Sequence, residues 1–251
     1  MSASASVSVH ELTKVFPDRK RGDVVAVDRV SFEANAGEIF GLLGVNGAGK
    51  TTTLRVLATM LRPTRGEVRI AGYSVSSDPQ EVRRRIGFMS AATSLYGRLT
   101  ARELVTYFGR LHGMAPGELA RRREELFELF GIRDFQDRRC DRLSSGMKQK
   151  VSIVRTVIHD PQVMIFDEPT ASLDVLTSRT IVEFIRDCRR RGKCVLFSTH
   201  IMEEVEKLCD RVLVIHRGKL LAVETKALLC ARSPSGRVED AFVALAGSEG
   251  A

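Results

Sequence analysis

The sequence predicts an α/β fold in which helices pack against a mostly parallel β-sheet. First, several short apolar runs have the length and composition of strands that are buried on both faces, which is typical of parallel sheets. Second, these runs alternate with stretches of helical spacing, and such an alternating order favours parallel strands. The runs lie at residues 39–43, 163–166 and 194–198.

A glycine-rich loop follows the first of these runs. Residues 44–51 fit G-x-x-x-x-G-K-[ST], with a helix expected to begin near Lys50. Glycines let successive backbone N–H groups turn inward, and the helix adds its positive dipole end, so the loop predicts a phosphate site. A glycine-rich turn that matches by chance is the alternative. The expected nucleotide-binding residues are Gly44, Val45, Asn46, Gly47, Ala48, Gly49, Lys50, Thr51 and Thr52.

Two side chains of this loop have more specific predicted roles. Lys50 should reach the terminal phosphates of the nucleotide. The Thr51 hydroxyl is placed to ligate a Mg²⁺ ion that bridges those phosphates. The loop therefore predicts a nucleotide with its magnesium ion, without indicating what the nucleotide is used for.

An acidic pair and a histidine are expected at the same edge of the sheet. Asp167 and Glu168 follow one predicted strand, and His200 follows another. Ligands bind at the carboxyl ends of such strands. Adjacent side chains there point in different directions, so Asp167 should face magnesium and Glu168 an attacking water. A solvated acidic pair and a structural histidine are the alternatives, but the order and spacing favour contact between His200 and the γ-phosphate.

A second helix N-terminus is predicted within residues 143–150. Ser144 suits an N-cap, and the helix is expected to run to about residue 159. Apolar side chains recur at helical spacing at Met147, Val151, Val154 and Ile158. This N-terminus is a second anion-binding end. The intervening segment of about a hundred residues is long enough to form a helical subdomain.

The ordered set of motifs resembles the ATPases of ABC transporters over nearly the whole chain. The Walker A loop is 44–51, the signature is 143–150, and the Walker B motif ends in Asp167-Glu168. The D-loop is Ser172-Leu173-Asp174, and His200 is the switch histidine. The resemblance implies a P-loop NTPase core with a mostly parallel sheet, an N-terminal antiparallel β subdomain and an inserted α-helical subdomain. It also implies that the nucleotide is ATP, bound with Mg²⁺.

The resemblance implies contacts and partners that the residues alone do not show. Ser144 and Gly146 of one subunit contact the ATP held by the P-loop of another, in a head-to-tail dimer that we expect to be a homodimer. Phe16 lies where an aromatic ring stacks on adenine, although on composition it could equally be a core residue. The other implied partner is an integral membrane permease, which the ATPase drives.

Three positions depart from the family pattern. The usual signature is L-S-G-G-Q, whereas this chain has Ser145 and Met147 in place of a glycine and the glutamine. Ala91 takes the position of a glutamine that would help to orient magnesium and water. Either neighbouring hydroxyl groups substitute through a water, or the site turns over with fewer ligands. The hydroxyl groups in question belong to Ser90, Thr93 and Ser94.

Residues 94–103, with 108–114 after them, resemble the sodium and drug efflux branch of the family, of the ABC-2 type. Residues 145–152 show the same likeness. The likeness implies an exporter, and in the family the segment around residue 100 touches the membrane subunit. An ordinary loop and helix are the alternative interpretation of this segment.

Composition limits the classes of protein to which the chain can belong. In 251 residues, 43% of them hydrophobic, no apolar run approaches the length of about 20 residues that crosses a bilayer. The Ser/Ala-rich start shows no secretory signal, and the five cysteines lack metal-site spacing and suit a reducing cytosol. We therefore expect a cytoplasmic protein that is peripheral on the inner face of the cell membrane through its permease.

The net charge of +8 raises nucleic acid as a possible partner. The arginines cluster in short runs without interleaved aromatic residues, a pattern more typical of solvated helix faces. We therefore expect no nucleic acid. Anionic lipid could add attraction if these clusters face the membrane.

The predicted organisation is one ATPase domain over residues 1–230 and a tail over 231–251 that holds one short helix. Residues 1–88 and 160–230 should form the core with its β subdomain, and 89–159 the helical subdomain that carries the signature. No internal repeat is apparent.

Two other functions compete with a transporter ATPase. A soluble ABC ATPase for repair or translation would carry a long coiled coil or a second cassette, and neither is present in the sequence. A regulatory nucleotide-binding protein without turnover is disfavoured by Glu168 and His200 but favoured by Ala91. The transported substrate belongs to the partner's transmembrane helices, so this chain does not define it.

Overall fold

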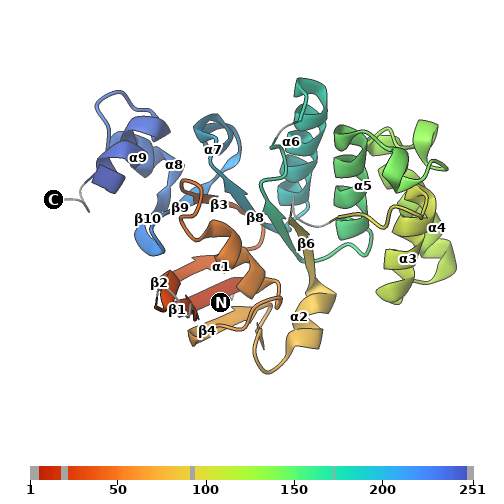
Figure 1. Cartoon of the computed structure of the whole chain (residues 1–251). Helices are drawn as coiled ribbons and strands as arrows, with labels where there is room; N and C mark the ends of the chain where they lie inside the picture. The colour runs from red at the N-terminus through yellow and green to blue at the C-terminus, as the bar shows by residue number, and fades with distance from the viewer. Residues whose placement is uncertain (1–5, 18–21, 91–93, 172, 248–251) are drawn as a thin grey trace.

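The computed structural model describes residues 6–17, 22–90, 94–171 and 173–247. In Figure 1 a single twisted sheet runs through these residues, with helices packed against it. The strands are β1 (Val7–Phe16), β2 (Val24–Ala34), β3 (Ile39–Leu43), β4 (Arg65–Ile70), β5 (Tyr73–Ser74), β6 (Ile86–Ser90), β7 (Val163–Asp167), β8 (Cys194–Thr199), β9 (Arg211–His216) and β10 (Lys219–Thr225). The helices are α1 (Lys50–Leu57), α2 (Pro79–Arg85), α3 (Ala101–Leu111), α4 (Pro116–Leu129), α5 (Ser145–Val157), α6 (Val175–Arg190), α7 (Met202–Leu208), α8 (Lys226–Ala231) and α9 (Val238–Gly247), with 3-10 turns at Arg133–Phe135 and Cys140–Arg142.

The strand order is β5-β4-β1-β2-β10-β9-β3-β8-β7-β6, and the five strands from β9 to β6 pair in parallel. The strands β1, β2, β4 and β5 pair antiparallel. β10 joins the two groups because it pairs antiparallel with β9 and in parallel with β2. The predicted α/β class with a mostly parallel core and an antiparallel N-terminal part is confirmed.

The central strands separate two hydrophobic cores. Phe40 and Leu42 of β3 pack with α1, α2 and the antiparallel strands, whereas Ile39 and Leu43 of the same strand pack with the helices on the opposite face. Successive side chains of a strand point to opposite faces, so a strand buried on both sides must be apolar throughout. This is why a five-residue apolar run identified the strand that delivers the glycine-rich loop.

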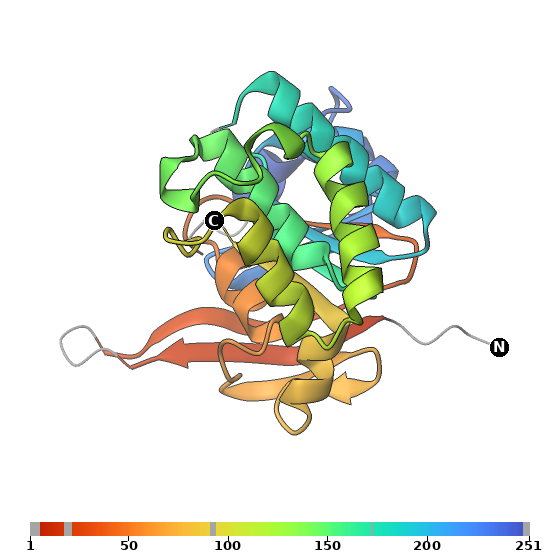
Figure 2. The same ribbon diagram turned by 90° about the vertical axis from the view of Figure 1, so that its right-hand side faces the viewer.

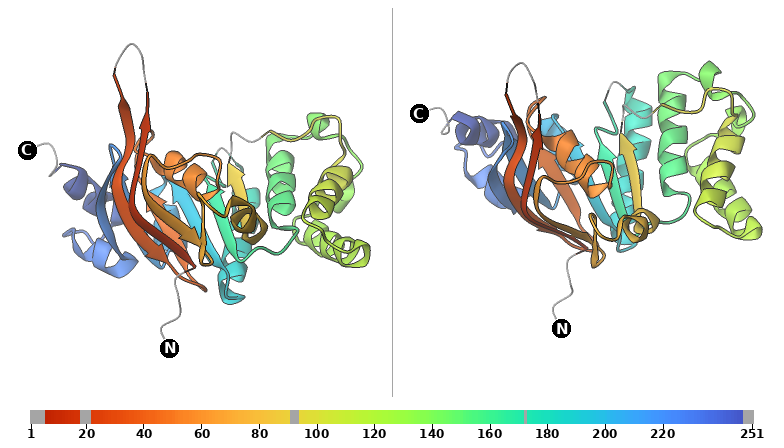
Figure 3. Two further views of the ribbon diagram at one scale, coloured as in Figure 1. Left: turned by 90° about the horizontal axis from the view of Figure 1, so that it is seen from below. Right: turned by 60° about the horizontal axis from the view of Figure 1, so that its bottom comes forward.

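The antiparallel strands form one end of this continuous sheet and lie below the helices in Figure 2. The β1–β2 hairpin extends well beyond the neighbouring strands when the molecule is seen from below (Figure 3). Three register shifts interrupt the pairing of β1 with β2. Such irregularities bend and twist a strand, and this pair is curved along its length.

The helices α3, α4 and α5 gather at one end of the molecule, and α8 and α9 at the other (Figure 1). A capping box between Thr100 and Glu103 begins α3, and the Ser144 side chain accepts from the backbone N–H of Met147 to begin α5. β6 continues to Ser90, so the first two residues of the predicted helical segment belong to the sheet. The boundaries predicted for the subdomains otherwise stay predictions.

The C-terminal helix α9 packs against α7 and α8, and α8 packs against β9 and β10. Val238 and Phe242 of α9 are buried, and the Val238 N–H donates to Glu206 Oε1 at 3.1 Å. Four cysteines are buried, namely Cys140, Cys188, Cys194 and Cys209, and Cys230 on α8 is partly exposed. Burial raises the pKa of Cys188, Cys194 and Cys209 to about 12. Among the described residues, no helix has both the length and the apolar character that crossing a membrane requires.

Candidate nucleotide site

The glycine-rich loop joins β3 to α1 and is held in a conformation that requires glycine. Gly47 and Gly49 have φ angles of +80° and +110°, a region that side chains disfavour. A Cβ atom at Gly44 would lie 2.4 Å from the carbonyl oxygen of Ile215, and one at Gly49 would lie 2.6 Å from that of Ala26. The neighbouring strands therefore press the loop into a tight turn at the N-terminus of α1.

Lys50 lies inside the loop rather than in solvent. Its side chain is 4% exposed, and Nζ donates to the carbonyl oxygens of Gly44 at 2.7 Å and Val45 at 3.1 Å. Nζ is also 3.7 Å from Glu168 Oε1. Burial lowers the pKa of Lys50, and the carboxylates of Glu168 and Asp167 partly oppose that shift. An arriving phosphate would supply the buried ammonium with a stronger acceptor than two neutral carbonyls.

A cavity of about 140 Å³, the P-loop cavity, opens beside this loop. Seven of the nine loop residues predicted to bind nucleotide line it, together with Ala26 and Glu168. The other two, Gly44 and Val45, contribute the carbonyl groups that hold Lys50. The cavity therefore brings a helix N-terminus, a buried cation and a carboxylate to one place.

Asp167 is buried at the end of β7 and accepts three hydroxyl hydrogen bonds. Thr51 Oγ1 and Ser198 Oγ donate to its Oδ1 at 3.1 and 2.7 Å, and Ser90 Oγ donates to its Oδ2 at 3.1 Å. A carboxylate beside a threonine hydroxyl is the oxygen-rich set that Mg²⁺ prefers, so these residues fit the ion. The described residues contain no group of three His, Cys, Asp or Glu side chains that could hold a metal, so phosphate oxygens and waters would complete the shell.

Glu168 departs from the direction of the strand. Its φ is +52°, which is uncommon for a residue with a side chain and recurs at functional sites. Its N–H donates to the backbone oxygen of Ser198 at 3.2 Å and to Ser198 Oγ at 3.1 Å. Its Oε1 lies 3.0 Å from Nδ1 of His200, whose side chain is 43% exposed. The structure thus brings together the acidic pair and the histidine that the sequence placed at one sheet edge.

The signature lies on a different part of the surface. Ser144 is exposed at the N-terminus of α5, where its hydroxyl accepts from the Met147 N–H at 3.3 Å. A Cβ atom on Gly146 would lie 3.5 Å from Asp174 Oδ2, and Asp174 caps α6. Neither Ser144 nor Gly146 is among the residues that line the P-loop cavity. Within one chain the two predicted phosphate-binding helix ends therefore do not meet.

The remaining residues singled out in the sequence have different outcomes. Phe16 ends β1 with 37% of its surface exposed and with Lys14 Nζ 5.0 Å from its ring centroid, so it belongs to neither core. Ala91 and Ser172 lie outside the described residues, as does Thr93. The hypothesis that Ala91 limits hydrolysis therefore stays a prediction. Ser90, offered as a substitute for the missing glutamine, instead contacts Asp167 directly.

Several contacts at this site were not anticipated from the sequence. The sequence places Ser198 only within a predicted strand, yet its hydroxyl bonds both Asp167 and the backbone of Glu168. Gln149 Nε2 donates to the carbonyl oxygen of Pro169 at 2.6 Å. Parallel pairing of β7 with β8 sets Asp167 opposite Ser198, so only knowledge of the strand register would have placed this hydroxyl.

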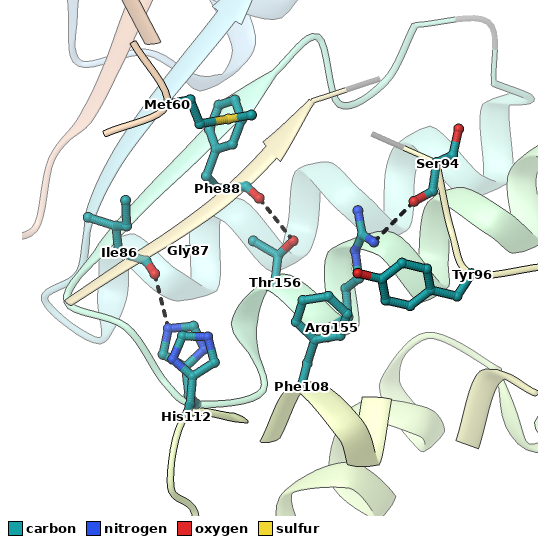
Figure 4. A pocket seen from close by; sticks show the side chains of 11 residues that line it. Met60, Ile86, Gly87, Phe88, Ser94, Tyr96, Phe108, His112, Arg155 and Thr156 are labelled. Carbon is teal, nitrogen blue, oxygen red and sulfur yellow. Dashed lines mark hydrogen bonds between the residues drawn. The ribbon is translucent and has the colours of Figure 1, made fainter. Parts of the chain in front are cut away.

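A second and larger cavity, of about 360 Å³, lies between β6 and the helices α3 and α5 (Figure 4). Tyr96, Phe108 and the buried Arg155 form one side of it, with the guanidinium 5.3 Å from the Phe108 ring centroid. His112 and His159 form the other side and stack with ring centroids 3.5 Å apart. None of its eleven lining residues carries a carboxylate.

Comparisons with known proteins find a matching family and similar ATP-binding proteins. Residues 27–171 match the ABC transporter family. The chain is 45% identical over 216 residues to the ABC transporter ATP-binding protein NatA of Bacillus subtilis (strain 168), covering 86% of this chain and 87% of that protein. It is 34% identical over 211 residues to the linearmycin resistance ATP-binding protein LnrL of the same organism, covering 84% and 68%.

Solved structures resemble the fold closely. One is the ATP binding subunit of an ABC transporter, with a TM-score of 0.86 and 28% identity over 95% of this chain and 98% of that one. Another is a dimeric post-hydrolysis state of an ATP-binding cassette with ADP and Pi, with a TM-score of 0.80 and 26% identity over 87% and 98%.

Proposed function

This chain belongs to the ABC transporter family, and we propose on that premise that it is one of two ATP-hydrolysing subunits that drive a separate membrane permease of the exporter type. The observation that carries the proposal is the contact of Glu168 with His200, 3.0 Å apart beside the P-loop cavity. A protein that only bound ATP would not need a carboxylate placed there to accept a proton from water.

Binding of the nucleotide would begin with the loop and Lys50. The N–H groups at the N-terminus of α1 and the Lys50 ammonium would hold the phosphates, and Lys50 would exchange its carbonyl partners for phosphate oxygens. Mg²⁺ would be held by Thr51 and Asp167, and when bound it neutralises charge that develops on the phosphates. Ser90 and Ser198 keep the Asp167 carboxylate in place.

Hydrolysis needs a water aimed at the γ-phosphate. Glu168 is the candidate general base, because its side chain turns away from Asp167 and toward the cavity. His200 contacts Glu168 through Nδ1, so that it can orient the carboxylate and contact the γ-phosphate. Lys50 Nζ lies 3.7 Å from Glu168 Oε1, and phosphate oxygens would compete with Glu168 for this ammonium.

The second half of each site would come from another subunit. Ser144 is exposed at a helix N-terminus that lies apart from the cavity of its own chain, and this supports a head-to-tail dimer. A solved cassette that resembles this chain is dimeric with ADP and Pi. Phe16 is the candidate to stack on adenine, because its ring is partly exposed at the end of β1.

The larger cavity is the proposed docking site for the permease. Its lining combines aromatic rings with Arg155 and two histidines and lacks a carboxylate. A short cytoplasmic helix with apolar side chains and one acidic side chain would complement it in both shape and charge. Such docking would hold the ATPase on the inner face of the membrane. A relative named Nod factor export ATP-binding protein I, 38% identical over 205 residues, supports the direction of transport.

The test is to express the chain with candidate permeases and recover what copurifies. We expect an integral membrane protein, and we expect ATP hydrolysis that is lost in Glu168→Gln. Recovery of soluble proteins or nucleic acid alone would contradict the transporter role. Normal hydrolysis by Glu168→Gln would contradict the role given to that carboxylate.

A further inference from the structure

One carboxylate on α7 joins the segment after β7, which contains Glu168, to the end of β8, which precedes His200. The hydroxyl of Thr170 donates to Glu204 Oε1, and the hydroxyl of Thr199 donates to Glu204 Oε2 at 2.6 Å. Both threonines are buried. Each carboxylate oxygen therefore accepts from a different buried hydroxyl, and neither threonine has to leave its proton unpaired.

These two threonines flank the proposed catalytic pair. Thr170 lies two residues after Glu168, and Thr199 directly precedes His200. The in-register ladder between β7 and β8 ends at the pair of Asp167 with Ser198. Glu204 therefore extends the connection between these strands beyond the last rung of the sheet, at the place where Glu168 and His200 meet.

The same short segment is also held from the signature side. Gln149 on α5 donates to the carbonyl oxygen of Pro169, between Glu168 and Thr170. The chain after Glu168 is thus fixed by α5 on one side and by α7 on the other. Loss of either contact would free a segment whose Glu168 already has a backbone conformation that is unfavourable for a residue with a side chain.

We propose that Glu204 is a positioning residue for ATP hydrolysis, which holds Glu168 and His200 in contact through Thr170 and Thr199. The inference rests on the proposed catalytic role of Glu168. Glu204 itself does not line the P-loop cavity, so its effect is transmitted through the two threonines. A displacement of about 1 Å in a catalytic group can lower a rate on the order of a hundredfold, so a distant carboxylate can have a large effect.

The alternative is that Glu204 only stabilises the first turn of α7. Acidic residues favour a helix N-terminus in general, and Glu203 shares that property. The two roles differ in what they change. If the role is structural, removing Glu204 lowers the free energy of unfolding. If the role is positioning, removing Glu204 lowers kcat and leaves KM for ATP nearly unchanged.

The experiment measures steady-state ATP hydrolysis and thermal unfolding of the full chain. The variants are Glu204→Ala and Glu204→Gln, and Glu203→Ala is the matched control, because Glu203 lies on the same turn with 75% of its side chain exposed and an ion pair to Lys207. We expect kcat to fall about tenfold to a hundredfold in Glu204→Ala, with KM changed less than about twofold. Glu204→Gln should lose less of its kcat. The amide oxygen still accepts from one threonine hydroxyl, and the amide nitrogen donates to the other hydroxyl once that hydroxyl acts as acceptor.

Thr170→Val and Thr199→Val provide a second route if Glu204→Ala folds poorly. Each keeps the shape of the side chain and removes one contact to Glu204, so each should lower kcat. Glu204→Ala in a His200→Ala background should add little further loss, because both act on the same contact. Unchanged kcat in Glu204→Ala, or an independent additional loss in the double variant, would overturn the inference. Normal turnover in Glu168→Gln would instead remove the proposed function on which the inference rests.

Discussion

The two helix ends that we propose to bind phosphate differ in how far a single chain surrounds them. At the N-terminus of α1, the loop glycines are locked against neighbouring strands and Lys50 is buried among carbonyl groups and a carboxylate. At the N-terminus of α5, Ser144 is exposed and its hydroxyl is occupied by its own helix. The fold of one chain surrounds the first end with its own groups, whereas it leaves the second end exposed at the surface. This difference is what the proposed head-to-tail dimer would resolve, because the second end would meet the nucleotide held by another chain.

The strongest test of this difference is complementation between two inactive variants. Lys50→Ala disables the first helix end, and Gly146→Asp places a negative charge at the second. Each variant alone should lose almost all ATP hydrolysis. Mixed together, they should recover activity, because a head-to-tail heterodimer contains one site with both ends intact.

The measurement is phosphate release at a fixed total protein concentration across mixing ratios, with a peak expected at equal amounts. Gly146→Ala is the control for steric effects, because a Cβ there meets no atom closer than 3.4 Å. A flat, inactive profile at all ratios would show that the two ends do not cooperate between chains.

The second prediction concerns ATP hydrolysis at the cavity beside the N-terminus of α1. Glu168→Gln should lower kcat by about a hundredfold to ten-thousandfold, because an amide does not accept the proton of the attacking water. ATP binding should persist, so the ATP-bound dimer should become easier to isolate by size-exclusion chromatography. Glu183→Gln on the exposed face of α6 is the control. A variant that fails to bind ATP would indicate that Glu168 serves binding rather than hydrolysis.

The third prediction concerns two stacked histidines, one at the end of α3 and one after α5. His112 at the end of α3 stacks on His159, which contacts the carbonyl oxygen of Ile86 on β6. Burial lowers the pKa of His159 to about 4. The nearby Asp160 carboxylate opposes this shift, and the Lys193 ammonium adds to it. Burial also lowers the pKa of His112. His159 therefore binds a proton more readily in the unfolded chain than in the folded one. The contribution of neutral His159 to the free energy of unfolding is complete above about pH 6.5 and is lost as the pH falls toward 4.

Urea unfolding at pH 7 and pH 5 measures this effect. His159 should contribute about 2 kcal/mol less to the free energy of unfolding at pH 5 than at pH 7. His159→Gln should reduce the pH dependence, because it removes the buried imidazole whose pKa is lowered. Equal pH dependence in the wild type and His159→Gln would exclude His159 as its source.

The smallest expected effect is at Ala91. If the absence of a glutamine there slows hydrolysis, Ala91→Gln should raise kcat several-fold, because an amide beside the water and magnesium would help to orient both. The measurement is kcat at saturating Mg-ATP, with Ala91→Leu as the control for side-chain size. An unchanged or slower rate in Ala91→Gln would show that Ser90 and the other ligands suffice at this position.

The sequence predicted the elements that carry local patterns and missed the contacts that depend on register. The predicted strand at residues 39–43 coincides with β3, and the N-cap at Ser144 is where it was expected. α2 was not anticipated within a β-rich segment, because Val82 is its one buried residue and no apolar stripe marks it. The bonds of Ser198 and Glu204 join segments whose alignment only the folded sheet determines.

The distribution of thiols in the fold makes the native chain suitable for labelling. The four buried cysteines are shielded, and burial raises the pKa of all four, so they will react slowly with maleimides. Cys230 is the more accessible thiol and lies on α8, at the end of the molecule away from the signature. A single spin label or fluorophore at Cys230 would report the separation between the two copies in a dimer as ATP is bound and hydrolysed, without any substitution in the protein.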